Sequence, residues 1–258
     1  MMNKDKFNLR KNVRVSVASF MANVALVFFS YRLVIEYDGL EAVGLWSLLM
    51  AWGALIRIGD VGMGGAILRF ISAKNLENEV LEIRKYIDTG LIMNVLAFAF
   101  LTLVGYFLVK KNLSFLIEDK SLVQAYLLLP ILFGGIFLSS VTTLLVSSLQ
   151  GLHFGYVGSY LTVGGNIIQI LMVFLLVPDM GVMGLAWAQL IQFAILILVG
   201  WYLVTNKTKM LGYFPHNFSI PVLKEMLGFS LKSQVANIAN GLFEPVSKIL
   251  FSQFAGLQ

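Results

Sequence analysis

Residues Arg57 to Arg69 read RIGDVGMGGAILR and interrupt an otherwise apolar run from Val43 to Ile71. About 20 apolar residues are enough to cross the hydrocarbon core of a bilayer, so this run predicts a membrane span. It nevertheless holds the charges of Arg57, Asp60 and Arg69, with glycines at positions 59, 62, 64 and 65. A charge near the centre of a span costs about 2.5–3.5 kcal/mol, and glycine permits a break in the helix. Charge beside such a break is typical of a polar path across a membrane.

The composition of the chain is that of an integral membrane protein. Hydrophobic residues make up 58% of the 258 positions, whereas soluble domains contain about 45–50%. The few charged residues lie in groups between apolar runs of helical length, which predicts an all-α bundle and not a β-barrel. The net charge of +5 comes mostly from basic residues at span ends, so no nucleic-acid partner is expected. The chain has no cysteine and two distant histidines, and we expect no metal and no cofactor.

The order of apolar runs predicts seven spans, at 13–35, 43–71, 88–109, 122–149, 156–177, 182–204 and 227–254. A polar stretch with two prolines, 205–226, is expected to be a linker. With the N-terminus in the cytoplasm, eleven Lys and Arg residues near span ends lie inside and four lie outside. This bias favours a cytoplasmic N-terminus. The predicted outer loop 110–120 opposes it, because it holds three lysines.

Span seven resembles span one when the chain is shifted by 217 residues. In span seven, polar residues recur at steps of three and four and form one stripe: Ser230, Ser233, Gln234, Asn237, Asn240, Glu244, Ser247 and Lys248. Span one carries a weaker stripe of Ser16, Ser19, Asn23 and Ser30. We expect both stripes to face something other than lipid. The repeat divides the chain into a six-span lobe (1–204), a cytoplasmic linker (205–226) and the first helix of a truncated second lobe (227–258).

Three motifs in order resemble one family of membrane proteins. The first is Ile58, Asp60, Gly62, Ala66 and Arg69 in span two; the second is Leu149-Gln150-Gly151 after span four; the third is Gly181, Gly184, Ala186 and Ala188 between spans five and six. This pattern resembles the polysaccharide biosynthesis transporters of the O-antigen flippase type, within the multidrug/oligosaccharidyl-lipid/polysaccharide exporter superfamily. The resemblance implies a two-lobed transporter of 12 to 14 spans, of which this chain would be the N-terminal lobe and one further helix.

The resemblance also implies a function, which is transport and not catalysis. The expected substrate is an undecaprenyl-diphosphate-linked oligosaccharide, flipped by alternating access across the inner membrane of a bacterium for surface polysaccharide such as O-antigen or capsule. The expected partners are this lipid, membrane lipids, and H⁺ or Na⁺ as a coupling ion. One alternative is an ion-coupled multidrug exporter of the same superfamily, although intramembrane acidic residues do not outnumber basic ones. A glycan polymerase or acyltransferase is a further alternative, which the short outer loops and the absence of an intramembrane histidine oppose.

Charged residues inside the spans are the candidate binding residues. Arg57 and Asp60 are three apart and hence neighbours on one helix face. They form either a cavity pair that meets a phosphate or a structural ion pair that closes the break in span two. Arg14 and Lys232 are the other substrate-binding candidates. Asp60 and Glu244 are candidates for ion coupling, and Glu244 is also expected to pair with Lys248.

Other charged and polar residues have simpler explanations. Arg69 is expected to be a topology anchor at the inner end of span two, and Arg32 is expected to reach toward the outer surface. Asp88 is expected to open span three, where a carboxylate complements the helix dipole. Gln169 and Gln192 are candidates for hydrogen bonds between helices.

Overall fold

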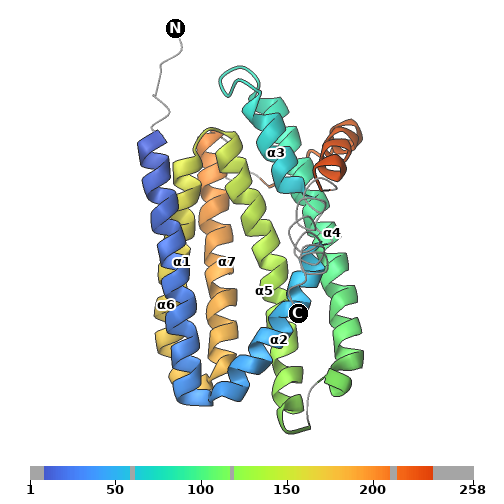
Figure 1. Cartoon of the computed structure of the whole chain (residues 1–258). Coiled ribbons are helices and arrows are strands. Elements are labelled where there is room, and N and C mark those ends of the chain that lie inside the picture. Colours follow the sequence, from blue (N-terminus) through green and yellow to red (C-terminus); the bar gives the residue numbers. More distant parts are fainter. Residues whose placement is uncertain (1–8, 59–61, 117–118, 210–213, 235–258) are drawn as a thin grey trace, which may run out of the picture.

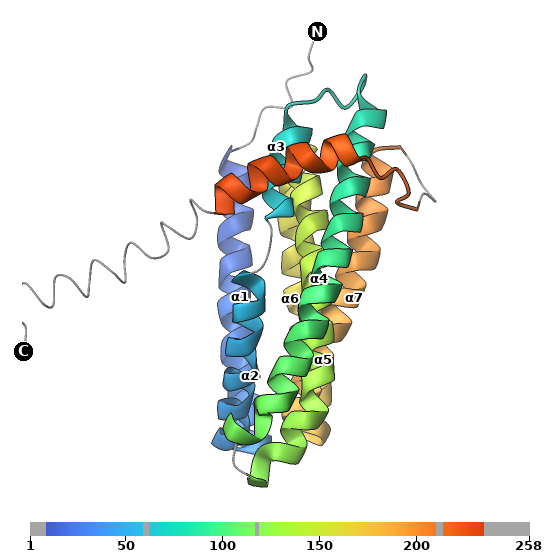
Figure 2. The same cartoon turned by 90° about the vertical axis from the view of Figure 1, so that its right-hand side faces the viewer.

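The computed structural model describes residues 9–58, 62–116, 119–209 and 214–234. Over these ranges the chain is helical, without strands. The helices are α1 (Leu9–Asp38), α2 (Leu40–Ile58), α3 (Met63–Ser72), α4 (Val80–Leu116), α5 (Asp119–Gly151), α6 (Gly155–Met180) and α7 (Val182–Lys207). A further helical segment, 220–234, is drawn in orange-red in Figures 1 and 2. We refer to it as the crosswise helix, because it runs across the end of the bundle in Figure 2.

Five of the described helices are long and apolar enough to cross a membrane, namely α1, α4, α5, α6 and α7. The shorter apolar helices α2 and α3 together occupy the predicted second span. The chain is therefore a multi-pass membrane protein, and the expected all-α bundle is confirmed. In both views α1 and α4–α7 lie side by side along one axis, so the expected membrane normal follows that axis (Figures 1 and 2).

Helix α5 is the centre of the bundle. It packs against α2, α3, α4, α6 and α7, while α1 packs mainly on α6. One apolar cluster includes Trp46, Leu129 and Val177, and a second includes Ile67, Leu145 and Leu196. The first lies toward the end where α1 meets α2, which we call the far end. The second lies toward the end where α1 begins, which we call the N-terminal end.

The expected break in the second span is present between α2 and α3. Gly62 stands before α3 with φ of 73°, a left-handed conformation that glycine adopts without strain. Its carbonyl accepts the backbone N–H of Ala66 at 3.3 Å and the hydroxyl of Ser230 at 3.2 Å. Ser230 belongs to the crosswise helix, so this helix satisfies part of the backbone that the break leaves open.

Several boundaries differ from the sequence prediction. The predicted outer loop 110–120 is mostly helical, since α4 continues to Leu116 and α5 begins at Asp119. Helix α4 has 37 residues and is therefore about 55 Å long, more than a bilayer core requires. The predicted linker 205–226 contains the first turns of the crosswise helix, which begins at 220 and not at 227. In the sequence, Pro221 and the polar residues before it indicate a linker. The helix nevertheless includes Pro221, because proline is compatible with the first turn of a helix.

Asp38 joins three helices at the far end of the bundle. Its Oδ2 accepts the backbone N–H of Val182 at 2.7 Å and the side-chain amide of Gln124 at 3.1 Å. Gly181, between α6 and α7, has φ of 58°, and a Cβ there would lie 2.3 Å from the same carboxylate oxygen. The close approach of Asp38 to the α6–α7 turn therefore requires glycine at 181.

The segment before the crosswise helix is held on α4 at the N-terminal end. Asp88 Oδ2 accepts the backbone N–H of Asn217 at 3.1 Å, and Thr89 Oγ1 accepts that of Ser219 at 3.1 Å. Asp88 is fully buried and lies two turns inside α4, which begins at Val80. The helix-dipole explanation expected for Asp88 is thus wrong, and its carboxylate instead anchors residues 214–219.

Candidate functional site

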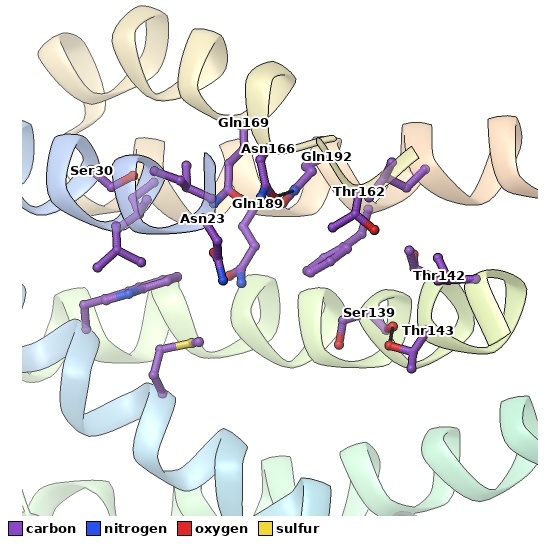
Figure 3. Close-up of a pocket in the computed structure, with 18 of the residues that line it drawn as sticks. Asn23, Ser30, Ser139, Thr142, Thr143, Thr162, Asn166, Gln169, Gln189 and Gln192 are labelled. Atoms are coloured by element: carbon purple, nitrogen blue, oxygen red, sulfur yellow. Dashed lines mark hydrogen bonds between the residues drawn. The ribbon is translucent and has the colours of Figure 1, made fainter. Parts of the chain in front are cut away.

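A cavity of about 690 Å³ lies between α1, α2, α5, α6 and α7. It forms where the two apolar clusters meet, since Trp46 of the first and Leu196 of the second both line it. Its polar lining consists of Asn23, Ser30, Ser139, Thr142, Thr143, Ser147, Gln150, Thr162, Asn166, Gln169, Gln189 and Gln192. Figure 3 shows that side chains from several helices converge on this space. The volume is in the range of binding pockets for small molecules.

Amide side chains from α1, α6 and α7 form one wall of the cavity. Gln192 Nε2 donates to Asn166 Oδ1 at 3.2 Å, and both residues are buried. This bond joins α6 to α7 and confirms that Gln192 bonds between helices. Asn23 and Gln189 point toward one another in Figure 3. Each amide presents both donors and an acceptor, so the wall offers both kinds of hydrogen-bond partner to a ligand.

Hydroxyl side chains form the opposite wall, on α5. Ser139, Thr142 and Thr143 lie along this helix in Figure 3. Thr142 and Thr143 donate to backbone carbonyls four residues earlier, at 3.1 and 2.9 Å. Such bonds use the hydroxyl proton and leave acceptor capacity on the oxygen. Across the cavity, the buried Ser30 hydroxyl of α1 makes no hydrogen bond to any residue that the structure describes.

The described lining of the cavity is polar but uncharged. None of the described residues that line it is Asp, Glu, Lys or Arg. Its aromatic members are Tyr31, Trp46 and Phe193, which come from three different helices. Aromatic rings present a flat apolar face, and neutral amides and hydroxyls pair with hydroxyl groups in either direction. This chemistry suits a neutral ligand with many hydroxyl groups better than a cation.

The predicted charged residues lie elsewhere or outside the described part of the chain. Arg57 falls in the last turn of α2 and Arg14 in the first turns of α1, and only their backbones are described. Asp60 and Glu244 lie outside the described residues. Lys232 lies on the crosswise helix, beside a second groove that Arg69 also lines. The described lining of the cavity therefore consists of neutral residues and includes none of the charged candidates.

One sequence signal did point to the cavity. The polar stripe predicted on the first span contains Asn23 and Ser30, and both line this space. Helix α1 therefore turns this part of its stripe away from lipid, as expected. Asn166, Gln169 and Gln192 of α6 and α7 are also polar residues within apolar spans, which indicates that they too face away from lipid. Their convergence depends on how α6 and α7 pack, which spacing along the chain does not determine.

The fold is similar to about half of each of several solved transporters. It is similar to a MOP-superfamily transporter from Pyrococcus furiosus whose binding pocket is described as having reverse polarity, with a TM-score of 0.68 and 18% identity. It is also similar to the outward-facing form of a multidrug-resistance MATE-family transporter, with a TM-score of 0.70 and 18% identity. A MATE protein in complex with Br-NRF gives 0.66 and 18%. Each comparison covers 90% of this chain but only 53%, 53% and 55% of the respective transporters, so the chain spans about half their length.

The family is identified from the amino-acid sequence. The profile of the family described as "Polysaccharide biosynthesis protein" matches residues 4–258. The chain belongs to this polysaccharide biosynthesis protein family, as its motifs indicated. No curated protein matches the chain.

Proposed function

We propose that the chain forms one lobe of a flippase for an undecaprenyl-diphosphate-linked oligosaccharide, which serves surface polysaccharide assembly at the bacterial inner membrane. The observation that carries the proposal is the cavity whose described lining is uncharged and consists of amides, hydroxyls, aromatic rings and aliphatic side chains. A hydrated glycan needs such a path because the hydrocarbon core offers it no hydrogen bonds. Membership of the polysaccharide biosynthesis family supports the same substrate class.

In this proposal the two parts of the substrate headgroup meet different residues. The sugars occupy the neutral cavity, where Gln189 and Ser30 are available to their hydroxyls. The diphosphate is held by the arginines predicted for this role, Arg57 beside the α2–α3 break and Arg14 on α1. Asp60 and Glu244 remain the candidates for coupling transport to H⁺ or Na⁺. The N-terminal end of the bundle faces the cytoplasm, in line with the charge bias of the sequence.

A multidrug exporter is the alternative that shares the fold. Cationic drugs are bound best where carboxylates line the cavity, because a buried cation must be neutralised. The described cavity residues provide no carboxylate. This difference favours a glycan substrate over a cationic drug.

The proposal is tested by a flipping assay with the protein in sealed vesicles. A lipid-linked oligosaccharide is placed in one leaflet, and its arrival in the other is followed with a membrane-impermeant glycosidase. We expect protein-dependent flipping, slowed in the Arg57→Ala variant and lost when the coupling gradient is collapsed. Flipping that ignores both the H⁺ and the Na⁺ gradient would rule out the coupling role. Gradient-driven export of a cationic drug without flipping of the glycan lipid would overturn the proposal itself.

A further inference from the structure

Another groove lies at the N-terminal end of the bundle, away from the neutral cavity. It has a volume of about 330 Å³ and lies between α3 and the crosswise helix. Its residues are Arg69, Phe70, Lys224, Glu225, Gly228, Phe229 and Lys232. We refer to it as the basic groove. It shares no lining residue with the neutral cavity, and its chemistry is different.

Aromatic packing fixes one cation of the basic groove. The guanidinium carbon of Arg69 lies 4.3 Å from the ring centre of Phe229 and 5.9 Å from that of Phe70. Phe70 in turn stacks on Tyr86, with ring centres 5.4 Å apart and an interplanar angle of 18°. A guanidinium over an aromatic face keeps its N–H donors free for an anion. The two rings therefore hold the guanidinium of Arg69 in place at the groove.

The two lysines lie on one face of the crosswise helix. Lys224, Gly228 and Lys232 follow at steps of four, so they share that face. A Cβ at Gly228 would meet no atom within 4 Å, so the space between the lysines is open. The carboxylate in the groove, Glu225, accepts the hydroxyl of Tyr86 at 2.6 Å. Three cations against one carboxylate leave the described groove with a net positive charge of two.

The crosswise helix has the form of a helix that lies in a membrane interface. Its exposed side carries apolar residues beside the lysines, with Ile220 59% and Leu231 57% exposed. The opposite side is buried, with Met226 and Ser230 fully covered. Figure 2 shows the helix lying across the ends of the membrane-spanning helices. An amphipathic helix in this orientation places its apolar edge among acyl chains and its lysines at the level of lipid phosphates.

We infer that the basic groove binds the phosphate of an anionic phospholipid in the leaflet at the N-terminal end of the bundle. Arg69 donates hydrogen bonds to the phosphate while Lys224 and Lys232 neutralise its charge, and the acyl chains lie along Ile220 and Leu231. Lysines near a membrane surface attract anionic lipid, and zwitterionic lipid gains little from them. This site is independent of the transported substrate and gives Lys232 a role outside the substrate path.

The inference is tested by native mass spectrometry of the intact chain in detergent, titrated with phosphatidylglycerol, phosphatidylcholine or glycerophosphoglycerol. We expect a tightly bound phosphatidylglycerol, with phosphatidylcholine and the free headgroup binding at least tenfold more weakly. The Lys224→Gln/Lys232→Gln variant should lose about 30-fold in phosphatidylglycerol affinity, since each lysine contributes about 1 kcal/mol. Both lysines are exposed, so the fold should not depend on them.

Two controls separate the groove from general charge and from the cavity. Lys85→Gln/Lys209→Gln removes two exposed charges outside the groove and should change the affinity less than threefold. Gln189→Met alters only the neutral cavity and should leave lipid binding unchanged. Equal losses in the two lysine variants, or an unchanged affinity in Lys224→Gln/Lys232→Gln, would overturn the inference. So would equal binding of phosphatidylcholine, or of the headgroup without its acyl chains, which would indicate a site for a free anion.

Discussion

The neutral cavity and the basic groove differ in the chemistry of the side chains that line them. The cavity lies among the membrane-spanning helices and is lined by amides and hydroxyls, while the groove lies at the bundle end and is lined by three cations. This difference follows from the free energy of a charged group, which is high in the hydrocarbon region and low at the membrane surface. A polar path in the membrane can thus be built largely from neutral groups, with charge confined to helix breaks and ends.

Placing a charge in the neutral cavity should have the largest effect. Gln192→Glu replaces an amide that is 4% exposed and bonded to Asn166. We expect the free energy of unfolding to fall by about 2.5–3.5 kcal/mol at neutral pH. Gln150→Glu makes the same chemical change at an exposed position of the lining and should cost far less. Thermal unfolding in detergent measures both, and equal losses would mean that the cavity interior tolerates charge.

Loosening the crosswise helix should have an intermediate effect. Tyr86→Phe removes the hydroxyl that donates to Glu225 at 2.6 Å, while it keeps the ring that stacks on Phe70. We expect a loss of about 1 kcal/mol, concentrated in the attachment of this helix. Hydrogen exchange should accelerate in residues 220–234 and stay unchanged in α6. Uniform acceleration through the bundle would show that the helix is not held separately.

Changing the shape of the arginine in the basic groove should have a smaller effect. Arg69→Lys keeps the charge but loses the flat guanidinium that lies 4.3 Å from the Phe229 ring centre. We expect a loss of about 0.5 kcal/mol at this exposed site. A double-mutant cycle with Phe229→Leu isolates the contact. A coupling energy of zero would mean that Arg69 and Phe229 are merely neighbours.

The smallest effect is expected in the loop between α3 and α4, where Lys74 bonds to Glu82 and lies 3.5 Å from Glu79. The bond to Glu82 raises the pKa of Lys74 above 10.5, and the backbone N–H of Asn75 lowers that of Glu79 below its usual 4.5. The lowered pKa of Glu79 stabilises the fold above about pH 4.5, and this contribution is lost as the pH falls through the folded-state value. The raised pKa of Lys74 stabilises the fold below pH 10.5, and that contribution is lost as the pH rises further.

The pH dependence of Glu79→Gln checks this network. The difference in melting temperature between the native chain and the variant should be constant from about pH 6 to pH 9 and should shrink in acid. The effect should be small because the side chains of Glu79 and Glu82 are 40% and 57% exposed to solvent. A difference that grows as the pH falls would contradict the direction given for the pKa of Glu79.

The sequence predicted the helices, the break and the family, and it singled out Asn23, Ser30, Gln169 and Gln192 without predicting the cavity that they line together. Span positions follow from apolar length, which is a property of the chain alone. The break before Met63 follows from glycine and charge. Asn166 and Gln192 lie on two different helices, and their contact depends on the packing of α6 on α7. A helix was predicted from residue 227, and residues 220–226 were assigned to the linker because of Pro221 and the polar residues before it.

Charge drew the sequence interpretation toward Arg57 and Asp60, because an intramembrane ion is the strongest single signal in a sequence. Neutral amides give a weaker signal each and matter only when several converge. The free-energy cost of burying the group in the membrane explains both observations. A charged residue costs more and is therefore rarer in a span than a neutral amide. Substrates that carry one part of the headgroup without the other can separate the roles proposed for Arg57 and for the cavity amides.

The most direct measurement is the affinity of the protein for undecaprenyl diphosphate with and without its oligosaccharide, in the native chain and in Gln189→Met. We predict that the oligosaccharide increases the affinity of the native chain at least tenfold. The variant should lose most of this gain and bind undecaprenyl diphosphate alone as the native chain does. Equal binding of the two lipids by the native chain, or equal weakening of both in the variant, would contradict a sugar-binding role for the neutral cavity.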